Sequence, residues 1–270
     1  MKKKSVQTEY GAISYWTNDV LDPDCLTLFF MHGLALDHSV FDTQVRALED
    51  TYNIIVWDAP GHGCSEYMKP VCMDGLVEAV CLIASTEHIE GFVVVGQSYG
   101  GYIAQALIDR HRAYVRGFIG VGASPYGAQF YSEREMKSRE KAIARGRYIP
   151  WVMLRTVVAL TATSTNDGYE HMLHIVSCFS KASYLNIMRD YERAFIADNH
   201  DIDITCPMVL VYGEKDTIGN VLELGQAWHA VTRCKFVEIS GAGHVVQLDC
   251  PKEVTHQIDE FVRMLLADQR

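Results

Sequence analysis

The segment GQSYG at residues 96–100 constrains this chain more than any other part of its sequence. It follows the apolar run FVVV at 92–95 and precedes GYIAQALI at 101–108, which has the character of a helix. Glycines two residues before and after Ser98 permit a turn that is too tight for larger side chains. Such a turn exposes the serine hydroxyl beside the positively polarised N-terminus of the following helix. The pattern therefore predicts a buried strand, a sharp turn that presents Ser98, and a helix.

Four other apolar runs also end in loops that carry polar residues. The runs at 26–31 and 54–57 end in HGL at 32–34 and DAPGHGCS at 58–65. Far downstream, the run at 208–212 leads to Asp216, and the run at 235–239 leads to His244. Short continuous apolar runs are typical of strands covered on both faces, so we expect a mostly parallel sheet.

In this order, the loops make the chain resemble the α/β-hydrolase superfamily over nearly its whole length. The matching patterns are H-G-x, D-x-x-G-x-G-x-S, G-x-S-x-G, G-x-x-D and G-x-G-H. The order Ser98, Asp216, His244 is the order expected of that fold. The resemblance implies an α/β fold with a mostly parallel eight-stranded sheet, helices on both faces and an inserted helical cap.

The periods of the apolar residues predict the other elements. Alternation over 6–17 predicts a hairpin, helices are expected near 38–49, 73–88 and 99–111, and a sixth strand is expected at 115–122. One face of a last helix carries Val254, Ile258, Phe261, Val262 and Leu265. Asp249, which precedes Pro251, is placed to cap that helix.

Between 124 and 206 no apolar run is typical of a strand, and the apolar residues follow a helical period instead. The helical patterns cover 132–147, 150–162, 168–179 and 182–197. In the first, Glu133 with Lys137 and Glu135 with Arg139 have the i,i+4 spacing of ion pairs on a solvated helix. The superfamily inserts its cap after the sixth strand. We therefore expect a core domain formed by 1–124 and 206–270, and a cap formed by 125–205.

The resemblance and the chemistry of serine assign roles to five residues. Ser98 is the expected nucleophile, because a hydroxyl needs only an adjacent base to attack a carbonyl. His244 is the expected base, and Asp216 is expected to orient it and to stabilise its protonated form. The backbone N–H groups of Leu34 and Tyr99 are expected to bind the oxyanion.

Other residues compete for some of these roles. Asp58 is a rival acid, but in the superfamily its loop is structural. Some relatives carry the acid after the sixth strand, where this chain has GASP at 122–125 and no carboxylate, which favours Asp216. His32 is expected to brace the oxyanion loop without taking part in chemistry.

Substrate contacts are open to two interpretations. The side chains of Gln97 and Tyr99 either contact substrate or only pack. Trp151 and Phe179, with three methionines, form either an apolar pocket wall or the core of the cap. Three arginines of the cap either bind a carboxylate or lie on the surface. The methionines are Met153, Met172 and Met188, and the arginines are Arg155, Arg189 and Arg193.

Composition limits the partners. The formal net charge of −10 and the pI of about 5.5 disfavour nucleic acid and anionic membranes, and no apolar run is long enough to span a bilayer. We expect a small-molecule substrate with an apolar part, no cofactor and no metal; the sequence sets no oligomeric state. The eight cysteines and the polar start favour reduced, mostly buried thiols and a cytoplasmic location.

A serine at the turn excludes the branches of the superfamily that use an aspartate nucleophile. The leading hypothesis is hydrolysis of a carboxylic ester, thioester or lactone through an acyl-enzyme. An aminopeptidase and a lyase are also open, and there are two main alternatives. One is cleavage of a carbon–carbon bond in a ring-cleavage diketone by the same triad, and the other is a non-catalytic small-molecule binding protein with this fold.

Overall fold

The computed structural model describes residues 1–268, the side chains at 140, 142 and 144 excepted. Its centre is an eight-stranded sheet with the order β1-β2-β4-β3-β5-β6-β7-β8. The strands are β1 (Lys2–Thr8), β2 (Gly11–Thr17), β3 (Thr27–Met31), β4 (Asn53–Trp57), β5 (Phe92–Gln97), β6 (Val115–Val121), β7 (Met208–Gly213) and β8 (Lys235–Ile239).

Six neighbouring strands of the sheet, β4, β3, β5, β6, β7 and β8, are parallel to one another. Strands β1 and β2 are antiparallel to each other, and β2 is antiparallel to β4. Side chains from alternate positions of one strand enter different hydrophobic cores. Phe29 of β3 packs in the core on one face, and Phe30 packs in the core on the other. This arrangement confirms the predicted mostly parallel, eight-stranded sheet, and it explains why its strands read as continuous apolar runs.

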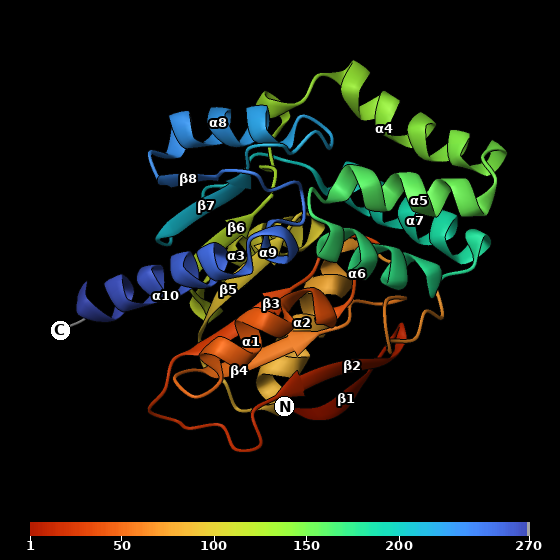
Figure 1. The fold of residues 1–270 in the computed structure, drawn as a ribbon. Helices are drawn as coiled ribbons and strands as arrows, with labels where there is room; N and C mark the ends of the chain where they lie inside the picture. The colour runs from red at the N-terminus through yellow and green to blue at the C-terminus, as the bar shows by residue number, and fades with distance from the viewer. Residues whose placement is uncertain (269–270) are drawn as a thin grey trace.

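Helices cover both faces of the sheet (Figure 1). One core contains side chains of α2 (Met73–Thr86), α3 (Tyr99–Arg110) and α8 (Val221–Thr232). The other contains side chains of α1 (Asp42–Leu48), α9 (Val246–Asp249) and α10 (Pro251–Asp268). The 3-10 helices η1 (His38–Phe41) and η2 (Arg112–Tyr114) precede α1 and β6.

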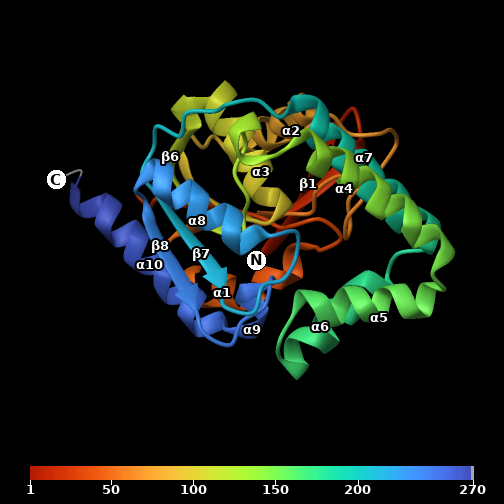
Figure 2. The ribbon, with the colours of Figure 1, turned by 90° about the horizontal axis from the view of Figure 1, so that it is seen from above.

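Four helices lie in the chain between β6 and β7. They are α4 (Glu133–Arg145), α5 (Trp151–Ala162), α6 (Asn166–Ser177) and α7 (Lys181–Asp198), with the 3-10 helices η3 (Ala128–Phe130) and η4 (Gly146–Tyr148) before and after α4. Both views show this group on the side of the molecule away from α10 (Figures 1 and 2). Serine or threonine side chains cap three of these helices: Ser132 on α4, Thr165 on α6 and Ser180 on α7.

The turn between β5 and α3 has the geometry that the glycines predict. Ser98 has φ 48° and ψ −115°, a conformation that costs a non-glycine residue of order 1–3 kcal/mol. A Cβ at Gly96 would lie 2.8 Å from the backbone oxygen of Gly100, and a Cβ at Gly100 would overlap the backbone carbonyl of Met31. The turn is therefore closed against the end of β3, and neither glycine has room for a side chain.

The structure also differs from the expectations. The hairpin begins at Lys2 instead of Val6, because Lys2 to Ser5 pair with β2. Helix α8 was not predicted, although its buried Val221, Gly225 and Trp228 follow a helical spacing. The eight cysteines are free, but three are exposed and five half-buried, so the expected burial was wrong. Within residues 1–268, none of the helices has the length and apolar character needed to cross a membrane.

We predict that Gly100→Ala destabilises the protein strongly. The new methyl group meets backbone, which cannot move aside as a side chain can, so we expect a loss of about 1–3 kcal/mol or more in the free energy of unfolding. Gly146→Ala is the matched control, because Gly146 has φ −55° and its new Cβ would meet only the ends of the flexible side chains of Leu185 and Leu154. Urea denaturation measures both, and equal stability of the two variants would contradict the steric account.

Candidate active site

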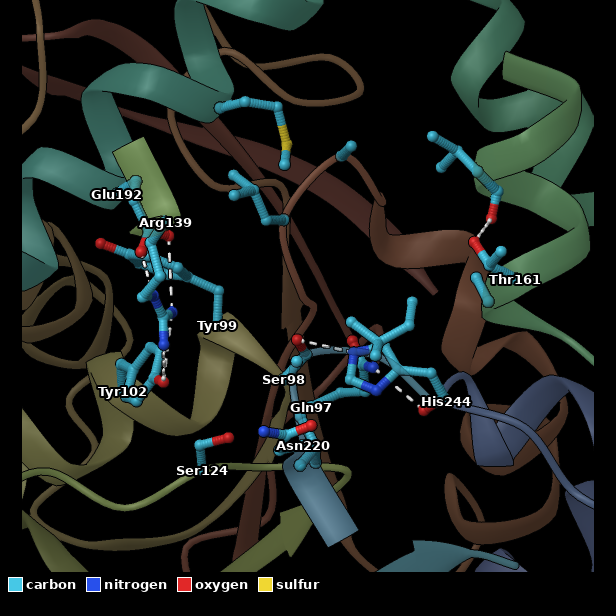
Figure 3. Close-up of a pocket in the computed structure, with 18 of the residues that line it drawn as sticks. Gln97, Ser98, Tyr99, Tyr102, Ser124, Arg139, Thr161, Glu192, Asn220 and His244 are labelled. Atoms are coloured by element: carbon cyan, nitrogen blue, oxygen red, sulfur yellow. Dashed lines mark hydrogen bonds and ion pairs between the residues drawn. The ribbon is translucent and has the colours of Figure 1, made fainter. Parts of the chain in front are cut away.

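Ser98, His244 and Asp216 form a continuous chain of hydrogen bonds, of which Figure 3 shows the contact between Ser98 and His244. Nε2 of His244 lies 2.9 Å from Oγ of Ser98, and its Nδ1 lies 2.8 Å from Oδ2 of Asp216. The residues come from three loops at the carboxyl ends of β5, β8 and β7. His244 and Asp216 are buried, and Ser98 is half-buried. The structure thus brings together all three residues that the sequence suggested as a triad.

Backbone contacts hold the two partners of the serine in place. The N–H of Ile218 donates to Oδ1 of Asp216 at 2.9 Å, which leaves Oδ2 directed to His244. Gly122, with φ 53°, lies against the backbone of His244, where a Cβ would be 2.9 Å from its carbonyl oxygen. The histidine loop is therefore packed against the end of β6, and the imidazole has little freedom to leave the serine.

The N–H groups of Leu34 and Tyr99 are unused donors beside the serine. Both residues line the same cavity as Ser98. Within the described residues, neither N–H donates a hydrogen bond to another protein group. Tyr99 is the first residue of α3, where a free N–H is normal. The side chain of Tyr99 is buried and donates to the carbonyl of Tyr191, so it packs on α7.

Two buried histidines brace the loop that carries Leu34. Nε2 of His32 accepts from the N–H of Ala59 at 3.0 Å, so its Nδ1–H donates to the carbonyl of Gly33 at 2.7 Å. Because the C=O and N–H of a trans peptide point in opposite directions, this bond turns the N–H of Leu34 away from His32. Nε2 of His62 accepts from the N–H of Ala35 at 3.1 Å. His32 thus braces the loop, as expected.

Burial keeps both histidines neutral. It lowers the pKa of His32 and lowers the pKa of His62 to about 3. The neutral form is also the one that the hydrogen bonds require, because each Nε2 must accept from a backbone N–H. Protonation would place an N–H donor against another donor at both positions.

Asp58 has a different set of partners. Its Oδ1 accepts from His38, through both the backbone N–H and Nδ1 at 2.8 Å, and its Oδ2 accepts from the N–H of Cys64 at 2.7 Å. Burial is the largest single influence and opposes its ionisation, but the hydrogen bond and charge of His38, together with the N–H of Cys64, outweigh it and hold the pKa of Asp58 below its usual range. Asp58 therefore joins two loops and does not contact His244, which removes it as a rival to Asp216.

A cavity of about 620 Å³ surrounds the serine, within the size range of small-molecule sites. Its walls come from the core loops and from the helices between β6 and β7. Apolar lining residues from α5 to α7 include Val158, Ala162, Met172 and Met188. Within the described residues, no group of three or more potential ligands could hold a metal ion.

Of the expected substrate contacts, Gln97 lines the cavity, and its Oε1 is buried without a hydrogen-bond partner. Trp151 and Phe179 lie outside the lining, contrary to the pocket-wall interpretation. Both rings pack on Tyr184 of α7 instead, with centroids 5.3 and 6.3 Å away; Trp151 begins α5, and Phe179 lies in the turn between α6 and α7. Met153 is exposed.

The three arginines considered as carboxylate ligands do not line the cavity either. Arg155 donates to Ser177, and Arg189 pairs with Asp190. Arg139 lines the cavity instead, and its ion-pair partner is Glu192 of α7, whereas the expected partner was Glu135. Glu135 completes the capping box of α4 with Ser132, which explains the change of partner.

Asp249 has a role that the sequence did not suggest. Its side chain was expected to cap α10, but it accepts hydrogen bonds from the N–H groups of Gly243, Ser164 and Thr165 and from the hydroxyl of Thr165. These bonds are 2.7–3.0 Å long. One carboxylate thus joins the residue before His244 to the turn between α5 and α6. No pattern in a single sequence marks this long-range contact.

We predict that the two neutral histidines make the protein lose stability in mild acid. Their folded pKa values lie below the unfolded value of about 6.5, so the unfolded chain binds more protons as the pH falls below that value. Stability is therefore full above about pH 6.5 and declines below it, by at most ~1.4 kcal/mol per pH unit for each histidine.

Urea denaturation between about pH 7 and 4.5 measures this decline. His62→Gln keeps an acceptor for the N–H of Ala35 but removes the titration, so its decline should be shallower. The control is His256→Gln, whose native side chain is 71% exposed. Parallel stability–pH curves for the wild type and His62→Gln would contradict the prediction.

Comparison with known proteins agrees with this fold. A family model described as the alpha/beta hydrolase family matches residues 28–257. The chain is 23% identical over 248 residues to 3-oxoadipate enol-lactonase 1 of Acinetobacter baylyi, covering 88% of this chain and 89% of that protein. It is 21% identical over 260 residues to the pimeloyl-[acyl-carrier protein] methyl ester esterase of Vibrio vulnificus, covering 92% and 97%.

Solved structures agree in fold. A thermophilic esterase from Thermogutta terrifontis superimposes with a TM-score of 0.79 at 20% identity, over 98% of this chain and 99% of that one. The enol-lactonase from Burkholderia xenovorans gives 0.78 at 19% identity, over 96% and 100%. With its parallel sheet, its serine turn and a family match over most of its length, the chain belongs to the α/β-hydrolase family.

Proposed function

We propose that the protein is a serine hydrolase that cleaves a carboxylic ester, thioester or lactone through an acyl-enzyme on Ser98. The observation that carries the proposal is the unbroken chain from Ser98 through His244 to Asp216, at a cavity that also holds two unused N–H donors. The relatives named above support this reaction class, since both are named for the cleavage of an ester or a lactone.

In the acylation step, Oγ of Ser98 attacks the carbonyl carbon while Nε2 of His244 takes its proton. The carbonyl oxygen becomes negatively charged and accepts from the N–H groups of Leu34 and Tyr99. The tetrahedral intermediate then expels the alcohol, thiol or ring oxygen, which takes the proton from His244. An ester of Ser98 remains.

Deacylation repeats these steps with water in place of the serine. Nε2 of His244 takes a proton from the water as its oxygen attacks the acyl carbon, and the oxyanion forms again at the same donors. Collapse of the second intermediate releases the acid and returns the proton to Oγ of Ser98. Asp216 stabilises the imidazolium in both steps, and its bond to Nδ1 leaves Nε2 free to face the serine.

The segment 125–205 acts in this proposal as a cap that selects the substrate. Its helices supply the apolar wall of the cavity, and the residues of the triad lie outside it. Each methylene that the substrate buries against this wall contributes about 0.8 kcal/mol, so an uncharged apolar portion is favoured. The expected partner is therefore a small molecule with an apolar part.

We predict that a fluorophosphonate probe labels Ser98 and no other serine. Within residues 1–268, only this hydroxyl has both a base and two unused backbone donors beside it. Ser98→Ala should fold normally, resist the probe and lower kcat for an activated ester by roughly 10³ to 10⁶. Mass spectrometry locates the label. A wild-type protein that binds esters but neither cleaves them nor reacts with the probe would be a binding protein with this fold.

The kcat for the activated ester also tests Asp216 as the acid of the triad. Asp216→Asn should retain the fold and lose on the order of 10⁴ in kcat, because the amide favours the wrong histidine tautomer. Asp58→Asn is the matched control, since Asp58 is a buried carboxylate bonded to a different histidine. A near-normal kcat in Asp216→Asn would remove Asp216 from the triad.

We further predict that Asp249 is a positioning residue for His244. Asp249→Ala removes the acceptor shared by Gly243 and the turn at 164–165, so His244 loses part of its support while the triad stays complete. We expect kcat to fall about 10-fold or more with KM changed less, and Asp249→Asn, which keeps one acceptor oxygen, to recover part of the loss.

The control for Asp249 is Asp259→Ala, which removes a partly exposed carboxylate of α10 that pairs with Arg263. Counting the serines that the probe labels separates positioning from simple loss of folded protein, because kcat is then referred to the active protein alone. A uniform loss of active protein with an unchanged kcat per labelled serine would contradict the positioning role.

A further inference from the structure

The cavity has one end that differs in chemistry from the rest. On the side of Ser98 opposite His244, Arg139 lies between Glu192 and Tyr102 (Figure 3). Arg139 comes from α4, Glu192 from α7 and Tyr102 from α3. The walls toward α5 and α6 are largely apolar. A substrate that fills the cavity would therefore meet a polar group at this end.

The guanidinium of Arg139 is held on one edge and free on the other. Its Nε bonds closely to Oε1 of Glu192, whose side chain is only 9% exposed. Its terminal nitrogens meet the hydroxyl of Tyr102 only at 3.4 and 3.5 Å, and Nη2 meets Oε2 of Glu192 only at 3.4 Å. Good N–H···O bonds are near 2.9 Å. Four terminal N–H groups thus have only long contacts.

Neighbouring rings fix the position of this cation. The guanidinium carbon lies 4.9 Å from the ring centre of Phe195 and 5.6 Å from that of Tyr131. The hydroxyl of Tyr131 donates to the carbonyl of Pro125 at 2.8 Å, and it lies 3.0 Å from the hydroxyl of Tyr102. At this end of the cavity, the terminal N–H groups of Arg139 are therefore the donors that lack short hydrogen bonds.

The charge balance selects the kind of group that would bind there. The charged lining residues are one arginine and three glutamates: Arg139, Glu135, Glu192 and Glu223. Arg139 is already neutralised by Glu192, so a substrate carboxylate would be repelled by the surplus of negative charge. An uncharged acceptor such as a ketone, ester or amide carbonyl takes up the free N–H groups without disturbing the ion pair.

We propose that the terminal N–H groups of Arg139, with Tyr102 beside them, form a subsite for an uncharged hydrogen-bond acceptor, located in the substrate at a distance from the bond that is cleaved. This inference rests on the proposed ester hydrolysis and specifies its substrate class: neutral esters or lactones with an apolar middle and a second carbonyl or similar acceptor. Glu192 positions Arg139 for this contact by holding its Nε edge.

Three methyl esters of one length test the subsite. Methyl 6-oxoheptanoate carries a distal ketone, methyl heptanoate replaces that carbonyl by a methylene, and monomethyl adipate places a carboxylate there. The set is repeated with the chain shortened and lengthened by up to two methylenes, to vary the spacing between the two ends. Values of kcat/KM are measured on the full-length protein.

At the best spacing, we expect the keto ester to exceed methyl heptanoate by about tenfold in kcat/KM, mainly through KM, and the half ester to be the poorest. A purely apolar cavity would give the opposite order for the first two, because burying an unpaired carbonyl is costly. The double variant Arg139→Met/Glu192→Met removes both charges together and should bring the keto-to-heptanoate ratio to one or below.

The ratio within one variant is insensitive to a general loss of active enzyme. Arg155→Met is the control, because Arg155 belongs to the same group of helices and lies outside the cavity lining. Its ratio should equal that of the wild type. Calorimetric titration of the uncleaved esters into Ser98→Ala gives the same ranking without turnover.

Three results would overturn the subsite: a wild-type ratio of one or less at every spacing, a ratio that survives in the double variant, or a preference for the half ester. The last would make Arg139 a carboxylate site. If the wild type cleaves no ester while Ser98→Ala still prefers the keto ester, the proposed hydrolysis fails and the subsite stands. If Ser98→Ala binds the three esters equally and the wild type cleaves none of them, both the proposed hydrolysis and the subsite are wrong.

Discussion

The backbone of Ser98 is the constraint on which the rest of the site depends. Its conformation, with φ 48°, is costly for a residue with a side chain, and it persists because the turn is closed on both sides. Gly96 and Gly100 allow α3 to approach β5 and the end of β3 more closely than any side chain would permit. This approach sets where the hydroxyl lies, and the loops of His244 and Leu34 are arranged around it.

Buried polar groups without net charge then stiffen the loops. His32 and His62 act as neutral acceptors and donors for backbone groups, so these two rings hold the segment that carries Leu34 without adding charge to it. The free energy of unfolding is therefore expected to fall in acid, because these rings take up protons only when the chain unfolds. The only carboxylate bonded to His244 is Asp216 within the described residues, and its second oxygen is occupied by backbone.

The helices between β6 and β7 are joined to the core at several points. The hydroxyl of Tyr99 donates to the carbonyl of Tyr191, and that of Tyr191 donates to the carbonyl of Pro60, so α7 is tied to two core loops. Asp249 ties the turn between α5 and α6 to the loop of His244. The two halves of the cavity therefore keep a defined position relative to each other, which a selective pocket requires.

The sequence by itself determined the mostly parallel sheet and the order of its loops, and the family resemblance of those loops implied that Ser98, Asp216 and His244 meet. These depend on local signals: apolar runs of strand length, glycines at a tight turn, and polar residues where parallel strands end. It missed α8, the hairpin's first residues and the exposure of the cysteines, because pairing and packing with distant segments settle such features.

Only the tertiary structure decided how the cavity is lined. The sequence left open whether Trp151 and Phe179 form a pocket wall or the core of the cap, and in the structure both rings pack on Tyr184 of α7. Arg139 had a possible partner four residues away and instead pairs with Glu192, 53 positions along the chain. Such choices depend on which helices meet and at what angle, and no local pattern of residues encodes that geometry.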